Sequence, residues 1–130
     1  MIYLDTSAFL KTVLDEAESV ALLSYLDSHP EGGLVSSSLL AVEARRGVLR
    51  HRPTRLPLVD VLLGQIAQLA ISDAVIESAG RLPDPMLRTL DAIHLSTALL
   101  IRQDVEVLLT YDVRLREAAE SHGLATAAPT

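Results

Sequence analysis

The sequence contains no cysteine and no tryptophan, and it has only one phenylalanine and three tyrosines among 130 residues. Without cysteine, the chain has no disulfide framework, thiolate zinc site or cysteine nucleophile. Its 3% aromatic content is too low for a nucleic-acid module that stacks bases on aromatic rings. No apolar run approaches the roughly 18 residues of a membrane helix, and no basic leader precedes Asp5. We therefore expect a cytoplasmic protein with no membrane span and no signal peptide.

Lysine is nearly absent, because ten of the eleven basic residues are arginines. The net charge of −6 argues against a general nucleic-acid binder, which usually presents a basic face. Five arginines nevertheless fall within residues 45–55, so the charge of the whole chain does not decide the partner. The length and the 49% hydrophobic content fit one domain over residues 1–130 rather than a disordered tail.

Short apolar runs alternate with longer helical segments, which is typical of a parallel α/β sheet. We expect strands at 2–4, 34–36, 69–71, 105–109 and 124–126. We expect helices over 7–14, 16–28, 38–50, 72–82, 88–102 and 113–122, and another that begins at Pro57. Val20 and Leu23 belong to the apolar repeat of the second helix, and Leu90 and Leu100 to the stripe of 88–102. The predicted fold class is α/β, a three-layer α/β/α sandwich with a central, mostly parallel sheet.

Four acidic residues are candidates for one site. Asp5 and Asp112 follow predicted strands, and ligands of open parallel sheets bind at the carboxyl ends of the strands. Glu43 and Asp91 lie in predicted helices among apolar neighbours, where an unpaired ionised carboxylate is costly. Carboxylates that converge on one pocket repel one another unless one keeps its proton or a cation lies between them. Oxygen-only ligands suit Mg²⁺ or Mn²⁺, which can activate water for attack on a phosphodiester.

Each acid also has a local explanation. Asp5 and Asp112 are suited to capping the helices that follow them, and Asp91 to the amino-terminal turn of its own helix. Glu43 is suited to pairing with an arginine on an exposed face of its helix. One shared site explains all four acids at once, and we therefore favour it.

Several neighbours of these acids are open to two interpretations. His94 shares a helical face with Asp91, but we favour a structural, partly buried histidine over a metal ligand. Thr6 and Thr110 are placed either to support the site or to cap local structure. Three arginines that follow Glu43 are candidates for nucleic-acid binding as well as for a solvated helix face: Arg45, Arg46 and Arg50.

Four motifs together resemble the PIN-domain family, particularly its VapC-type ribonuclease toxins: LDTSA at 4–8, EAR at 43–45, RTLDAIHL at 88–95 and LTYDVRL at 109–115. The resemblance covers nearly the whole chain, and the RTLDAIHL motif is its most specific part. It implies a Mg²⁺- or Mn²⁺-dependent endoribonuclease that leaves a 5′-phosphate and a 3′-hydroxyl. It also implies an RNA substrate, a cognate antitoxin protein and, commonly, a homodimer.

The resemblance assigns roles position by position. Asp5, Glu43, Asp91 and Asp112 match the acidic catalytic and metal positions, and Thr6 and Thr110 match the hydroxyl positions beside them. Some PIN domains carry a further acid shortly after the last of these, where this chain has Arg114, Leu115 and Arg116. The resemblance therefore does not extend to a second metal ion.

Other enzyme classes lack a required residue. An aspartyl phosphatase needs a second aspartate where Ser7 stands, and a receiver domain needs a lysine near its last strands, whereas Lys11 is the only lysine. No glycine-rich loop ends in the lysine and hydroxyl pair of a P-loop. Two alternatives remain: a non-catalytic module of the same fold that sequesters a protein or RNA partner, and a nuclease that acts on DNA.

Overall fold

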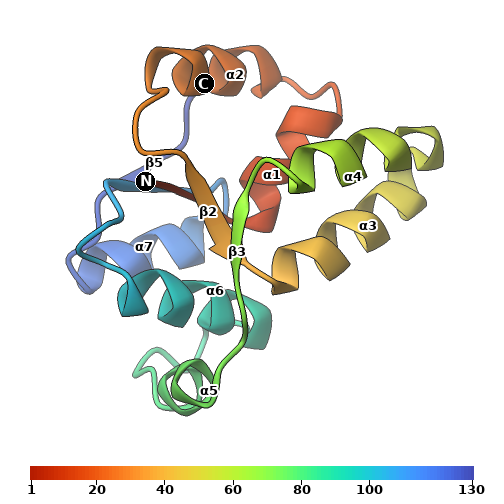
Figure 1. The fold of residues 1–130 in the computed structure, drawn as a ribbon. Coiled ribbons are helices and arrows are strands. Elements are labelled where there is room, and N and C mark those ends of the chain that lie inside the picture. Colours follow the sequence, from red (N-terminus) through yellow and green to blue (C-terminus); the bar gives the residue numbers. More distant parts are fainter.

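A five-stranded parallel β-sheet forms the centre of the computed structural model, which describes residues 1–130 (Figure 1). Its strands are β1 (Ile2–Leu4), β2 (Leu34–Ser37), β3 (Ala67–Leu69), β4 (Val107–Leu109) and β5 (Thr126–Ala127). The helices are α1 (Thr6–Val13), α2 (Ser19–Ser28), α3 (Leu39–His51), the 3-10 helix η1 (Pro53–Arg55), α4 (Leu56–Leu63), α5 (Asp73–Gly80), α6 (Thr89–Leu100) and α7 (Val113–Ser121). Every neighbouring strand pair is parallel. The predicted sandwich is confirmed, with a sheet that is parallel throughout.

The two faces of the sheet are covered by different helices, which gives the three layers (Figure 1). On one face, Ile2 and Leu4 of β1 pack with buried residues of α1, α2, α3 and α4. On the other face, Tyr3 packs with Leu95 of α6 and Leu115 of α7, and α5 packs against α6. Successive side chains of a strand point to opposite faces, so the three residues of β1 contribute to both apolar clusters. None of the helices combines the length and apolar composition needed to cross a membrane.

Local signals in the sequence set several helix ends as expected. The Ser72 hydroxyl accepts a hydrogen bond from the Val75 amide at the start of α5, and Pro57 lies in the first turn of α4. Gly123 follows α7 with φ +86°, a conformation that glycine adopts without steric cost. The helix ends that the sequence predicted from Ser72, Pro57 and Gly123 are therefore confirmed.

Two strands lie at other residues than predicted, because pairing with neighbours decides which residues of an apolar run join the sheet. The third strand is Ala67–Leu69 rather than 69–71, and Ala67 pairs with Val35 of β2. The last strand is Thr126–Ala127 rather than 124–126, and Ala127 pairs with Leu109 of β4.

Two predicted apolar stripes are wrong in part, because some of their members are exposed. In α6, Leu90 and Leu100 are 45% and 59% exposed, whereas most residues between Ala92 and Ala98 are buried. This helix is enclosed by β2, α5 and α7, so its middle is buried rather than a single stripe. In α2, Val20 is 80% exposed while Leu22 is fully buried.

The order of the strands places a site at one edge of the sheet. The chain proceeds outward from β1 through β2 to β3, and then crosses to β4 on the opposite side of β1. This reversal lies between β1 and β4, and open α/β sheets typically bind their ligands beyond the carboxyl ends of the strands at such a point. Asp5 and Asp112 follow these two strands.

The adjacent leucines of α2 provide a matched test of this packing. Leu22→Ala should lower the free energy of unfolding by about 2–5 kcal/mol, because its fully buried side chain leaves a cavity. Leu23→Ala should lower it by less than about 1 kcal/mol, because Leu23 is 45% exposed. Urea denaturation of both variants measures the difference, and equal losses would contradict the assignment of Leu22 to the core.

Candidate functional site

Asp5 is held at the carboxyl end of β1 by a complete set of hydrogen-bond donors. Its carboxylate accepts from the Ala8 amide at 2.9 Å, the Ser7 hydroxyl at 2.7 Å and the Thr110 hydroxyl at 2.6 Å. The first contact is the amino-terminal cap of α1, so the predicted capping role is confirmed. Thr110 belongs to the segment that follows β4, and it joins the ends of the two central strands.

Burial dominates the electrostatics of Asp5, which is only 2% exposed. Loss of water raises the pKa of its carboxyl, and the hydrogen bonds from Thr110, Ala8 and Ser7 oppose that rise. A buried carboxylate with a raised pKa beside other acids is a frequent feature of functional sites. The carboxylate is therefore fixed in place, and a cation that approached it would stabilise its ionised form.

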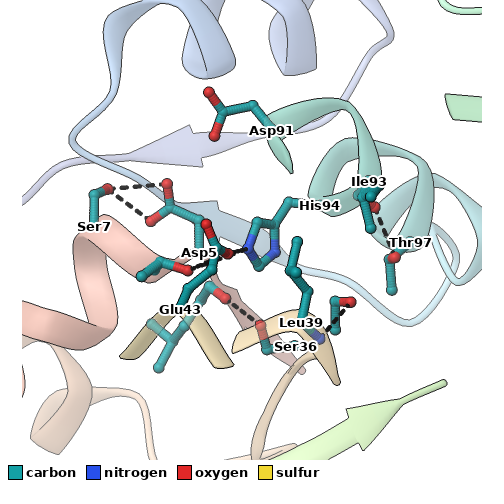
Figure 2. Close-up of polar contacts among 12 residues, drawn as sticks. Asp5, Ser7, Ser36, Leu39, Glu43, Asp91, Ile93, His94 and Thr97 are labelled. Atoms are coloured by element: carbon teal, nitrogen blue, oxygen red, sulfur yellow. Dashed lines mark hydrogen bonds and ion pairs between the residues drawn. The ribbon is translucent and has the colours of Figure 1, made fainter. Parts of the chain in front are cut away.

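Glu43 of α3 belongs to a hydrogen-bonded chain of side chains from four elements, and its contact with His94 is drawn in Figure 2. Its Oε1 accepts from the Thr6 hydroxyl at 2.7 Å and from Nε2 of His94 at 2.8 Å. The other ring nitrogen of His94 lies 2.8 Å from the hydroxyl of buried Tyr3. Burial would raise the pKa of Glu43, but the hydrogen bonds from His94 and Thr6 outweigh it and lower that pKa.

This chain decides two open questions from the sequence. Glu43 is not paired with an arginine of α3; it turns inward to Thr6 and His94. His94 is 1% exposed with both ring nitrogens engaged, so the structural role is confirmed and neither nitrogen remains for a metal. Thr6 supports Glu43, as Thr110 supports Asp5.

Asp91 and Asp112 are joined by one arginine. Arg88, the residue before α6, donates from Nε to Asp91 at 3.1 Å and from an Nη to Asp112 at 2.6 Å. Burial raises the pKa of Asp91, Arg88 opposes this, and the negative charge of Asp112 adds to the rise. Asp112 also caps α7 through the Leu115 amide, as predicted. The two aspartates therefore repel each other and share one counter-charge.

The four predicted acids thus come together at one edge of the sheet. Figure 2 shows Asp5, Glu43 and Asp91 on three different elements around His94, and Arg88 connects Asp91 to Asp112. An all-carboxylate donor set fits a hard divalent ion such as Mg²⁺ in its chemistry. No group of three or more histidine, aspartate and glutamate side chains lies in a metal-holding arrangement. The fit to a metal is one of donor type, and the predicted metal ligation stays a prediction.

The three candidate nucleic-acid arginines lie on the exposed side of α3. Arg45 is paired with Asp60 at 3.0 Å. Arg46 and Arg50 are exposed and form no ion pair. Their role in binding also stays a prediction.

Reasoning from the sequence missed two contributors to this site. It did not identify Tyr3, because a tyrosine within an apolar strand is equally typical of a simple core residue. It quoted Arg88 only as part of a motif and gave it no role. The signal for Arg88 was available, since an arginine three residues before Asp91 on a helix is at ion-pairing distance.

The contact between Tyr3 and His94 gives a test of this network. Tyr3→Phe removes a buried hydroxyl and leaves a ring nitrogen of His94 without its partner. We expect the free energy of unfolding to fall by about 1–3 kcal/mol. Tyr25→Phe is the matched control, because no hydrogen bond involves the Tyr25 hydroxyl and its loss should change stability little. Thermal unfolding of both variants measures the difference, and equal stabilities would argue against the network.

Comparison with known proteins agrees with this architecture. A family model of the PIN domain matches residues 2–121. Ribonuclease VapC35 of Mycobacterium tuberculosis is 41% identical over 131 residues, which cover 99% of this chain and 97% of that protein. The crystal structure of M. tuberculosis VapC20, described as a sarcin-ricin loop cleaving toxin, superimposes with a TM-score of 0.76 at 14% identity and covers 99% of this chain and 100% of that one. VapBC2 of Rickettsia felis, bound to a DNA fragment from its promoter, gives a TM-score of 0.75 at 16% identity with full coverage of both chains. The chain belongs to the PIN-domain family, as a VapC-type toxin.

Proposed function

We propose that this protein is a Mg²⁺- or Mn²⁺-dependent endoribonuclease, the toxin of a toxin–antitoxin pair, which acts on RNA in the cytoplasm. The observation that carries the proposal is the hydrogen-bonded arrangement of four acids beside the reversal between β1 and β4, in which Thr110 holds Asp5, Thr6 holds Glu43 and Arg88 joins Asp91 to Asp112. Relatives named ribonucleases and 41% identical over nearly the full length support the same reaction. A divalent ion bound there supplies activation of water and neutralisation of charge on the phosphodiester.

The chain's own residues have distinct tasks in this proposal. Asp5, Asp91 and Asp112 would hold the ion, directly or through water, and Glu43 would help to position the ion or the attacking water. Thr110 and Ser7 fix the direction of the Asp5 carboxylate. Thr6 and His94 do the same for Glu43, so each acid is oriented before substrate arrives.

The partner in this proposal is a cognate antitoxin protein, and the toxin itself forms a homodimer. One structural neighbour is a toxin–antitoxin complex from Klebsiella pneumoniae, which supports the first part. The chain offers a pocket between α1, α2 and α4 lined by apolar side chains, including Phe9, Leu23, Leu26 and Ile66. A helix with an apolar face is the chemistry that such a surface accommodates.

Cleavage of RNA by the purified protein tests the function directly. Asp5→Asn and Asp91→Asn should each reduce Mg²⁺-dependent cleavage of single-stranded RNA at least about a hundredfold, equivalent to about 2.7 kcal/mol of barrier. Both variants should fold, because asparagine keeps an oxygen that accepts hydrogen bonds and the neighbouring hydroxyls can reverse their direction. Chelation of the metal should abolish cleavage by the native chain.

The matched control for these variants is Asp73→Asn, an exposed aspartate in the first turn of α5. It should retain full activity. Full activity in either site variant would remove that residue from the catalytic group. Failure of the native chain to cleave any RNA with metal would favour the non-catalytic module, and parallel assays on single-stranded DNA separate the two nuclease classes.

The exposed arginines of α3 give a second prediction, made in the inactive Asp5→Asn background so that RNA stays intact. Adding Arg46→Gln and Arg50→Gln should weaken binding of single-stranded RNA. Each phosphate contact that is lost should also reduce the slope of log affinity against log salt by about 0.7. Fluorescence anisotropy at several salt concentrations measures both effects. Arg81→Gln, which removes the same charge from an exposed ion pair on α5, is the control; an equal effect there would show that the site of the charge does not matter.

A further inference from the structure

Arg88 has an unusual position for a surface arginine. Its side chain is 66% exposed, yet two of its nitrogens bind carboxylates on different elements: Asp91 at the start of α6 and Asp112 at the start of α7. These are two of the four acids on which the proposed reaction depends. Arg88 also lies close enough to Glu43 for their charges to interact. One guanidinium thus supplies positive charge to most of the acidic group.

The oxygens that Arg88 occupies are those that a cation needs. At Asp112, Oδ1 accepts the capping bond from the Leu115 amide and Oδ2 accepts from Arg88. At Asp91, Oδ2 accepts from Arg88 at 3.1 Å. A divalent ion bound to both aspartates would lie beside a guanidinium of the same sign, and like charges at such distances repel strongly away from bulk water. The ion and Arg88 therefore compete for the same oxygens.

We propose that Arg88 is a built-in counter-ion of the acidic site, which a divalent metal must displace from Asp91 and Asp112 before the site can work. Arg88 thereby sets the metal affinity of the enzyme. It binds two carboxylates that would otherwise repel each other, and it leaves them when the metal binds. This inference rests on the proposed function, because it takes the same acids as the metal site.

Metal binding without substrate tests the proposal. Mn²⁺ is titrated calorimetrically into the full-length native protein and into Arg88→Gln at constant ionic strength. We expect Arg88→Gln to bind Mn²⁺ about tenfold more tightly, a change that corresponds to about 1.4 kcal/mol. The variant should also show the larger rise in melting temperature on addition of Mn²⁺, because the metal binds the folded state and replaces a missing counter-charge.

Three further variants make the result specific. Arg88→Lys keeps the charge but loses the geometry that reaches both aspartates at once, so its affinity should lie between the native and Arg88→Gln values. Arg81→Gln removes the same charge from a solvent-exposed pair with Glu77 and should bind Mn²⁺ as the native protein does. Asp91→Asn should bind more weakly, because it removes a ligand.

Side-chain NMR observes the displacement itself. The Nε–H signal of Arg88 is assigned by its absence in Arg88→Gln. In a separate titration with Mg²⁺, without Mn²⁺, this signal should shift, whereas the Nε–H signal of Arg81 should not. A native protein that cleaves RNA with metal, together with unchanged or weaker Mn²⁺ binding in Arg88→Gln, would overturn the role of Arg88 and leave the proposed function standing. Absence of both metal binding and cleavage in the native protein would instead overturn the proposed function, and this inference with it.

Discussion

The burial of carboxylates is the constraint on which the candidate site depends. Asp5, Glu43 and Asp91 are each wholly or partly removed from water, and each would be destabilising without donors directed at it. The donors to these carboxylates are hydroxyls, backbone amides, one histidine and one arginine. The residues that flank the acids in the sequence therefore stabilise negative charge as well as supporting the proposed reaction.

Capping and function use the same side chains here, and the geometry shows why they do not conflict. Asp5 and Asp112 each give one oxygen to the first turn of the helix that follows, and their second oxygens point to Thr110 and Arg88. A carboxylate has enough acceptor capacity for both tasks. The sequence alone left capping and a shared site as alternatives, whereas the structure shows the capping contacts and the convergence together.

Sequence periodicity and caps were sufficient for the order of elements, because apolar strands, Pro57, Ser72 and Gly123 each act locally. They were insufficient where tertiary packing decides. Leu90 and Leu100 fit a helical stripe but face solvent, because α6 is enclosed through its middle. The partners of Glu43 were equally hidden, since Thr6 and His94 are 37 and 51 residues away along the chain and only the fold brings them into contact.

The two halves of the acidic site differ in rigidity, and the difference follows from exposure. Asp5 and Glu43 are oriented by groups within the protein, with Tyr3 and His94 almost fully buried behind them. Asp91 and Asp112 instead share Arg88, a long side chain that is mostly in water and loses little on leaving, although one oxygen of Asp112 is also held by the Leu115 amide. In the proposed reaction, an ion from solvent would therefore meet two carboxylates held by buried groups and two that are bridged by the exposed Arg88. The proposed displacement by a metal would therefore act on Arg88 and leave the hydrogen bonds of Asp5 and Glu43 in place.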